Sequence, residues 1–407
     1  MVKNCKANFS TLSKNLLGQA RRSAARKLID TMIIGIDGNE ANVNQRVGSG
    51  VYAFELLHEF SKNKKYEFVI YLKDFPLRDL PKESANFKYK IFGPRKLWTQ
   101  FALPVKLSFG SKIDIFFTLG HYGPRFSQIP YSITIFDLSY LRFPELFKKS
   151  DLYQLTNWSK YSIRSAKHIF TISYATKTDI IKNYKIDDRK ISVTYPGYDQ
   201  KGFKPQSKSK IEKVRNKYKV KDDYILFVGT LQPRKNVERL IEAFKKVTQL
   251  SVLSSWNLQL VIAGKNGWLY ESIFEKVKSL KLEKEIIFTD YVPDDELPAL
   301  ISGAKVFVLP SLWEGFGIPV VEAQACGVPV AVSDTSSLPE IVRESGVLVN
   351  PGSIDSVAQG IRKVLTDEKF RQNLIKKGFV NIKRFSWQKC ANETLETLEK
   401  LASNRIL

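Results

Sequence analysis

Residues 306–325 read VFVLPSLWEGFGIPVVEAQA. The first four residues are apolar and predict a buried strand, and the stretch from Val320 onward predicts a helix. Between them stand Gly315 and Gly317, which let a ligand approach the backbone closely, and Pro319, which suits the first turn of a helix. This order of strand, glycine turn and helix predicts an α/β fold with binding groups at the carboxyl end of a strand.

The start of this helix is suited to a diphosphate, because its free N–H groups and its dipole attract negative charge. Glu314 lies before the helix and Glu322 lies one turn inside it. We expect one carboxylate near the phosphates and the other set back from them, each able to accept charge-assisted hydrogen bonds from sugar hydroxyls. A Gly-Pro turn with ordinary helical glutamates is the simpler alternative. Two glutamates eight residues apart are common by chance, whereas the whole arrangement is not.

A second strand-to-helix turn has the sequence FVGTLQPRKN at residues 227–236. Gly229 ends the predicted strand, and the adjacent cations Arg234 and Lys235 are placed to neutralise a diphosphate leaving group. A solvated basic turn is the alternative. The third such loop, Gly48-Ser49-Gly50, is a weaker signal, equally typical of a generic flexible loop.

The rest of the chain repeats the alternation of apolar runs and helical stretches, which predicts parallel sheets covered by helices on both faces. The predicted strands are 32–37, 68–71, 113–117, 132–136, 169–172, 191–194, 224–229, 258–263, 286–288, 306–309 and 330–332. Nine basic and two acidic residues in 201–222 indicate an interdomain boundary. The predicted parts are a basic extension (1–31), a first Rossmann-like domain (32–200), a second (201–385), and a C-terminal helix (386–407) packing back on the first. The two doubly wound domains would face each other across a cleft.

The composition excludes several classes of protein. The 407 residues carry a net charge of +23, which attracts phosphate-bearing ligands, nucleic acid or an acidic membrane, unless it is only a solubilising coat. Three cysteines (Cys5, Cys326 and Cys390) without CxxC spacing argue against disulfides and zinc sites, and three histidines show no metal-ligand spacing. We therefore expect a cytoplasmic location and no metal site.

Residues 1–30 hold seven basic residues and one acid, with several leucines on one helical face. This pattern fits a basic membrane-surface helix, a transit peptide, or an extension ahead of the fold. No apolar run in the chain approaches the roughly 18–20 residues that span a bilayer.

From about Ile33 to Leu401 the chain resembles the family 4 glycosyltransferases (glycosyl transferases group 1), retaining enzymes of the GT-B fold. The resemblance is carried by the Glu-x7-Glu signature of Glu314 and Glu322. Further matches are FVGTLQPRKN (227–236), VPDDELPALISGAKVFVLPS (292–311) and GVPVAVSD (327–334).

The resemblance implies transfer of a hexose (mannose, glucose or rhamnose-like) from a nucleotide sugar to a glycan or lipid-linked acceptor, with retention of configuration and without metal. Glu314 would contact the donor sugar, Glu322 the ribose, and Arg234 and Lys235 the diphosphate. The remaining implied donor contacts are Gly50, Gly229, Val292 near the base, Phe316, Gly317 and Ile318.

Two departures from the family pattern bear on the chemistry. Thr230 stands where many members carry an arginine, so Arg234 is expected to supply that charge. Phe136 precedes Asp137 where many members carry a histidine beside the transferred sugar, and His121, in a glycine-flanked loop, could reach the same cleft. Asp137 is a conceivable nucleophile for a double displacement, although front-face return needs no enzyme nucleophile.

The acceptor is expected on the first domain, where 61–112 carry twelve basic and four acidic residues among Leu97, Trp98, Phe101 and Leu103. This suits a lipid-linked acceptor and peripheral contact with the inner face of an anionic membrane. A solvated surface over a core helix is the alternative. A nucleotide-sugar epimerase of the same fold and a basic nucleic-acid-binding protein remain as rival functions, although the sequence holds no nucleic-acid-reading motif.

Overall fold

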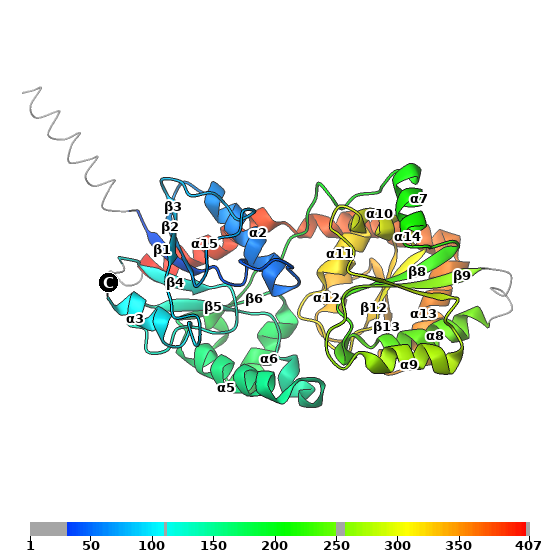
Figure 1. Ribbon diagram of the computed structural model, residues 1–407, viewed down its shortest axis with the longest axis horizontal. Coiled ribbons are helices and arrows are strands. Elements are labelled where there is room, and N and C mark those ends of the chain that lie inside the picture. Colours follow the sequence, from blue (N-terminus) through cyan, green and yellow to red (C-terminus); the bar gives the residue numbers. More distant parts are fainter. Residues whose placement is uncertain (1–30, 110–111, 250–256, 404–407) are drawn as a thin grey trace, which may run out of the picture.

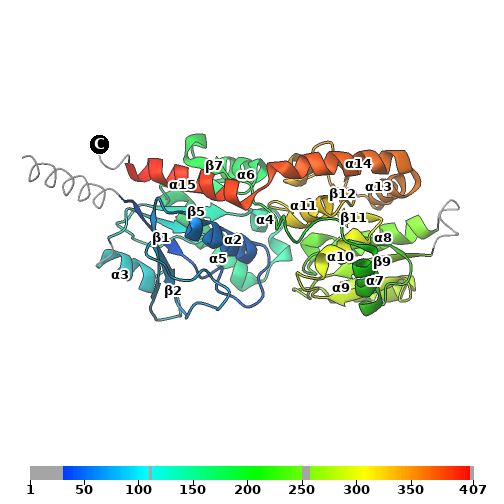
Figure 2. The same ribbon diagram turned by 90° about the horizontal axis from the view of Figure 1, so that it is seen from above.

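The computed structural model describes residues 31–109, 112–249 and 257–403. These residues form two α/β units side by side along the long axis of the molecule, each built on one parallel sheet (Figures 1 and 2). All but the last residue of the basic extension predicted at 1–31 lie outside the described residues. Within those residues, no helix is both long and apolar enough to cross a bilayer.

The first sheet has seven strands in the order β3-β2-β1-β4-β5-β6-β7, and every neighbouring pair is parallel. Adjacent residues on its central strand β4 face opposite sides: Phe117 packs in the core beneath α2, and Phe116 in a second core beneath α5. Both faces are therefore buried. Its strands are β1 (Ile33–Asp37), β2 (Glu67–Leu72), β3 (Phe87–Ile91), β4 (Ile115–Thr118), β5 (Tyr131–Ile135), β6 (His168–Thr171) and β7 (Ile191–Val193).

The second sheet has six parallel strands in the order β10-β9-β8-β11-β12-β13. In both sheets the strand order reverses beside the first strand, at β1/β4 and at β8/β11, which is where doubly wound folds bind ligands. Its strands are β8 (Asp223–Val228), β9 (Leu258–Ala263), β10 (Ile286–Asp290), β11 (Val306–Leu309), β12 (Val330–Ser333) and β13 (Gly346–Val349).

Helices connect the strands in both units. Those of the first are α2 (Ser49–Lys62), α3 (Ala102–Ser108), α4 (Ser139–Arg142), α5 (Lys149–Ser165) and α6 (Tyr174–Tyr184). Those that follow are α7 (Lys208–Lys217), α8 (Val237–Thr248), α9 (Glu271–Leu280), α10 (Leu297–Ser302), α11 (Ile318–Ala325), α12 (Leu338–Val342), α13 (Ile354–Thr366), α14 (Glu368–Asn381) and α15 (Trp387–Ser403). Short 3₁₀ turns occupy Pro144–Leu146, Asp188–Lys190, Pro233–Lys235 and Ile382–Arg384.

Two edge strands, β3 and β13, were missed by the sequence analysis. β3 has the sequence FKYKI, whose lysines interrupt the apolar run, and only its first residue is buried. β13 begins at Gly346 and buries only its last residue. Edge strands have one unpaired side and less burial, so their sequences lack the continuous apolar run of a central parallel strand.

The chain crosses between the two units twice, at neighbouring points. A side chain on Gly197 would lie 2.1 Å from the backbone nitrogen of Trp387, so only glycine allows the two crossings to pass this closely. After the second crossing, α15 packs against α2 of the first unit (Figure 2). Glu399 of α15 accepts hydrogen bonds there from Lys65 at 2.7 Å and from the Tyr66 hydroxyl at 3.0 Å.

Candidate active site

Two loops meet at the carboxyl ends of β8 and β11, the central neighbours of the second sheet. Asn236, which ends the β8 loop in the left-handed conformation (φ 60°), donates hydrogen bonds of 2.8 Å to the carbonyls of Pro310 and Pro351. The N–H of Leu312 donates to the Arg234 carbonyl at 2.9 Å. The side-chain amide of Asn236 and the main-chain bond of Leu312 thus hold the basic turn against the loop that carries Glu314.

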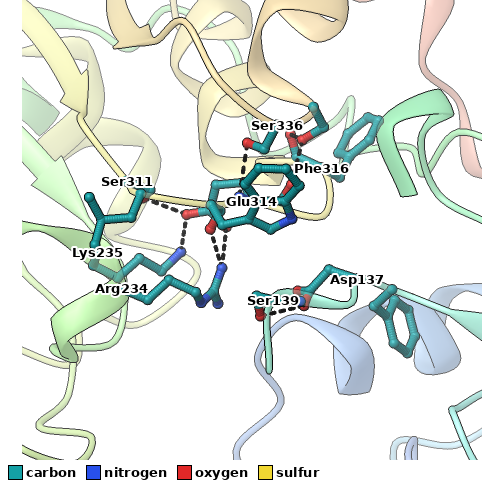
Figure 3. A network of polar contacts seen from close by, with 12 residues as sticks. Asp137, Ser139, Arg234, Lys235, Ser311, Glu314, Phe316 and Ser336 are labelled. Atoms are coloured by element: carbon teal, nitrogen blue, oxygen red, sulfur yellow. Dashed lines mark hydrogen bonds and ion pairs between the residues drawn. The ribbon is translucent and has the colours of Figure 1, made fainter. Parts of the chain in front are cut away.

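Glu314 lies at the centre of a buried polar network (Figure 3). It is 6% exposed, and its Oε1 accepts from Lys235 Nζ at 2.5 Å and from Ser311 Oγ at 2.6 Å. Its Oε2 lies 3.4 Å from a guanidinium nitrogen of Arg234, which also donates to the Trp313 carbonyl. The carboxylate is thus fixed between two cations at the switch point of the second sheet.

The charged groups of this network shift one another's pKa values. Burial opposes ionisation of Glu314, but Lys235 and Arg234 outweigh burial and hold its pKa at about 2. Burial also lowers the pKa of Lys235, although Glu314 opposes that shift. The Glu314 carboxylate therefore interacts with two cations, both within 3.4 Å of its oxygens.

The helix that follows begins at a glycine under steric constraint. Gly317 has φ 99°, which L-residues rarely adopt, and a side chain there would lie 2.8 Å from Leu338 Cδ2. The Phe316 side chain is buried, at 3% exposure, and its carbonyl accepts from Ser337 Oγ at 3.0 Å. Only the main chain of Phe316 is therefore placed to meet a ligand. Ile318 is partly buried as the first residue of α11.

Glu322 differs from Glu314 in its surroundings. It lies in α11 and is partly exposed. Burial, with the nearby carboxylates of Asp294 and Asp199, raises its pKa to about 8. The pKa values of the two glutamates are therefore shifted in opposite directions, that of the paired Glu314 downward and that of Glu322 upward.

Asp137 faces this network from the first unit (Figure 3). It follows β5, and its Oδ1 accepts from the Ser139 hydroxyl at 2.5 Å and the Ser139 N–H at 2.9 Å. Burial lowers the pKa of Arg234, but Glu314 raises it. Asp137 raises it further from the first unit, so the net shift of the Arg234 pKa is upward. The structure thus brings Asp137, Arg234, Lys235 and Glu314 into one site.

His121 is stacked on Phe136, with ring centroids 5.7 Å apart and planes inclined by 22°. Its Nε2 accepts from the Phe136 N–H at 3.1 Å, so in the neutral ring Nδ1 carries the proton. Among the described residues, Nδ1 is buried without a hydrogen-bond partner. Burial lowers the pKa of His121 although Asp137 opposes that shift, which favours the neutral ring. The loop after β4 therefore supplies an imidazole near Asp137, although the residue before Asp137 in sequence is Phe136.

Three further residues were predicted to contact the donor. Gly50 is in the first turn of α2, where a side chain would lie 3.2 Å from the Glu40 carbonyl. Val292 is 5% exposed, so a base could meet only its main chain. Gly229 lies at the end of β8, where a side chain would approach Lys235 Cε at 3.6 Å.

The sequence analysis missed the residues that support this site. Ser311 bonds the Glu314 carboxylate, and Ser336 accepts from the Glu314 N–H at 3.0 Å. Ser337 donates to the carbonyls of Glu314 and Phe316. Serines near glycine turns are too common to single out, so no signal in the sequence would have identified them. Within the described ranges, no group of three or more His, Cys, Asp or Glu side chains is arranged to hold a metal ion.

Comparison with known proteins identifies this arrangement. The family model described as Glycosyltransferase Family 4 matches residues 47–201, and the one described as Glycosyl transferases group 1 matches residues 208–381. O-antigen chain mannosyltransferase B of Escherichia coli is 32% identical over 286 residues, which are 69% of this chain and 74% of the relative. O-antigen chain mannosyltransferase RfbU of Salmonella typhimurium is 32% identical over 263 residues, 65% of this chain and 68% of the relative.

Solved structures agree on the fold. Sucrose-phosphate synthase from Thermosynechococcus elongatus superposes with a TM-score of 0.72 at 19% identity, covering 92% of this chain and 100% of that one. Anabaena HepE in complex with UDP and glucose gives a TM-score of 0.71 at 18% identity, covering 91% and 99%. Both sheets and their order are therefore those of the GT-B fold, and the chain belongs to the family 4 glycosyltransferases, enzymes that transfer a sugar residue.

Proposed function

We propose that this enzyme transfers a hexose, mannose in the first instance, from a nucleotide sugar to a growing glycan or a lipid-linked acceptor with retention of configuration. The observation that carries the proposal is the buried contact of Glu314 with Arg234 and Lys235 at the switch point of the second sheet. Mannose is favoured because the similar relatives are named as O-antigen mannosyltransferases.

In this proposal the site stabilises the departing diphosphate. The bond from the sugar's anomeric carbon to the phosphate oxygen breaks, and its electron pair stays on that oxygen. Arg234, Lys235 and the N–H groups at the start of α11 would neutralise the developing charge. Glu314 would orient the two cations and accept hydrogen bonds from sugar hydroxyls, while Glu322 and the main chain at Val292 would bind the nucleoside.

Retention follows most simply from front-face return. The acceptor oxygen would bond to the anomeric carbon from the side that the phosphate leaves, and its proton would pass to the leaving phosphate oxygen. Asp137, whose Oδ1 accepts from both Ser139 donors, is the alternative nucleophile. We assign Asp137 and the Nδ1–H of His121 to binding of the transferred sugar.

The decisive experiment is turnover with a panel of UDP-, GDP-, dTDP- and ADP-hexoses and a lipid-linked oligosaccharide, with the anomeric configuration of the product determined by NMR. Transfer with retention supports the proposal. Inversion, or donor isomerisation without transfer, would refute it.

We further propose that catalysis needs no divalent metal, because Arg234 and Lys235 occupy the place where a metal would neutralise the diphosphate. Donor binding measured by calorimetry should be the same with EDTA as with magnesium or manganese. Binding that disappears with EDTA and returns with either metal would contradict this prediction. We also place the enzyme in the cytoplasm in peripheral contact with an anionic membrane, which is where a lipid-linked acceptor would present its headgroup.

A further inference from the structure

A stripe of exposed apolar side chains runs along one side of the segment around α3. Leu97, Phe101, Val105 and Phe109 are 52%, 64%, 59% and 78% exposed. Each is joined to the previous one by a main-chain hydrogen bond of 3.0–3.2 Å from the N–H of residue i+4 to the carbonyl of residue i. Only Val105 lies within α3, but the bonds from residue i+4 to residue i continue on both sides of the helix, so the four exposed side chains follow one another along the segment. We call these four side chains the α3 stripe.

The segment is held firmly beneath this stripe. Trp98, Leu103 and Leu107 are at most 3% exposed and pack in the second core of the first sheet. The indole Nε1 of Trp98 also donates to the Phe92 carbonyl at 3.0 Å. Of the residues that the sequence analysis gave to an acceptor surface here, Trp98 and Leu103 are thus core residues, while Leu97 and Phe101 face outward. Since the core contacts are already satisfied, the exposed stripe is not needed for packing within the chain.

The stripe lies in a strongly basic stretch. Residues 84–113 contain six basic residues and no acidic residue. The exposed cations of this stretch are Lys88, Arg95, Lys96, Lys106 and Lys112. Arg95 pairs with Asp74, and the stretch remains strongly positive. Exposed apolar side chains in a strongly basic stretch complement an anionic lipid surface, where the side chains enter the headgroup region and the cations meet phosphates.

The stripe occupies the end of the molecule farthest from the second unit, where Figures 1 and 2 both place α3. The described chain starts at this same end, because the Ile33 N–H donates to Asp114 Oδ2, just after the α3 segment, at 2.7 Å.

We propose that the α3 stripe is the surface by which this enzyme docks on a membrane containing anionic lipids. The purpose of this docking rests on the proposed function, since docking would keep the enzyme near a lipid-linked acceptor. The test of docking does not depend on that function. With this end on the bilayer, the network of Glu314, Arg234 and Lys235 lies beyond the first unit, on the side away from the membrane. Such a position suits an acceptor whose growing end lies several sugars away from the membrane.

The test is sedimentation of the full chain with vesicles of phosphatidylcholine alone or with 30 mol% phosphatidylglycerol. The double variant Phe101→Ser/Phe109→Ser should bind the anionic vesicles at least about tenfold more weakly than the wild type, because two exposed aromatic anchors are lost. The matched control is Phe75→Ser/Phe126→Ser, which removes two phenylalanines, 81% and 82% exposed, outside the α3 segment. It should bind as the wild type does.

Two results would overturn the proposal. One is equal vesicle binding by the wild type and the Phe101/Phe109 variant, which would assign binding to residues 1–30. The other is loss of a dimer in light scattering by that variant without any change in vesicle binding, which would make the stripe a contact between copies. Affinity for free nucleoside diphosphate, measured in the same samples, reports separately on the proposed transferase function and should not change.

Discussion

Glu314 and Glu322 lie eight residues apart, yet neutralising each of them should change a different property of the enzyme, turnover for Glu314 and nucleotide affinity for Glu322. Glu314→Gln keeps the shape of the buried network but weakens its hold on Arg234, Lys235 and the sugar. We expect turnover to fall by about 30- to 1000-fold, corresponding to roughly 2–4 kcal/mol of transition-state stabilisation. Affinity for free nucleoside diphosphate, measured by calorimetry, should stay within a few-fold of the wild type.

The control is Glu322→Gln, which should weaken binding of the nucleoside diphosphate itself, with or without an attached sugar. If Glu314→Gln turns over normally, or abolishes nucleotide binding while Glu322→Gln does not, the two roles are assigned wrongly.

Glu322 should also make stability depend on pH. Its folded pKa of about 8 lies above the ordinary glutamate value of 4.5, so between these pH values the folded state holds a proton that the unfolded state releases. Stability from this group is therefore complete below about pH 4.5 and is lost as pH rises through about 8. Because the side chain is partly exposed, water screens the effect, and we expect Glu322→Gln to be roughly 1–2 kcal/mol more stable than wild type at pH 9.

At pH 5 the two proteins should be equally stable, since glutamine mimics the protonated acid. Urea unfolding at pH 5, 7 and 9 measures the difference. Parallel pH profiles for wild type and variant would mean that the carboxyl is not held protonated.

At the scale of elements, the start of α11 depends on Gly317. Alanine there would have to adopt φ 99° and would press its Cβ against Leu338 at 2.8 Å. We expect Gly317→Ala to lose about 2–4 kcal/mol of stability and to bind nucleoside diphosphate more weakly, because the helix start must shift. Chemical denaturation and calorimetry measure the two effects.

Gly48 provides the matched control for Gly317. It also has positive φ, at 52°, but a side chain there meets nothing within 4 Å. Gly48→Ala should therefore cost only the backbone strain, about 1 kcal/mol. Equal losses for the two alanine variants would show that contact with Leu338 is unimportant.

At the scale of the whole molecule, Glu340 of α12 ties the two units together. Its carboxylate accepts from the N–H groups of Tyr174 and Ala175 at 2.9 and 3.2 Å, at the start of α6 in the first unit. A carboxylate is favoured at a helix N-terminus by the free N–H groups and the dipole. We expect Glu340→Ala to loosen the units, with a larger radius of gyration in small-angle scattering and a several-fold higher KM for the donor.

Glu344→Ala is the control, since that side chain is 86% exposed and pairs with Lys377 inside the second unit. It should leave both quantities unchanged. A compact Glu340→Ala variant with normal KM would show that the remaining contacts, such as Arg142 over the Trp313 ring at 4.3 Å, hold the units by themselves.

The sequence by itself determined the central strands of both sheets and the turn that carries Glu314, because these depend on local patterns. A buried parallel strand needs a continuous apolar run, and the turn before this helix needs glycine and proline at particular positions. It also determined the family, since Glu314 and Glu322 are only eight residues apart and form one local sequence signature.

Only the tertiary structure decided how distant residues combine. Lys235 reaches Glu314 across 79 positions of sequence, and His121 reaches Phe136 across 15, because parallel strands bring their carboxyl ends to one edge. The opposite pKa shifts of the two glutamates likewise depend on burial and on neighbours from other elements. Such contacts are set by packing over the whole chain, which no local pattern encodes.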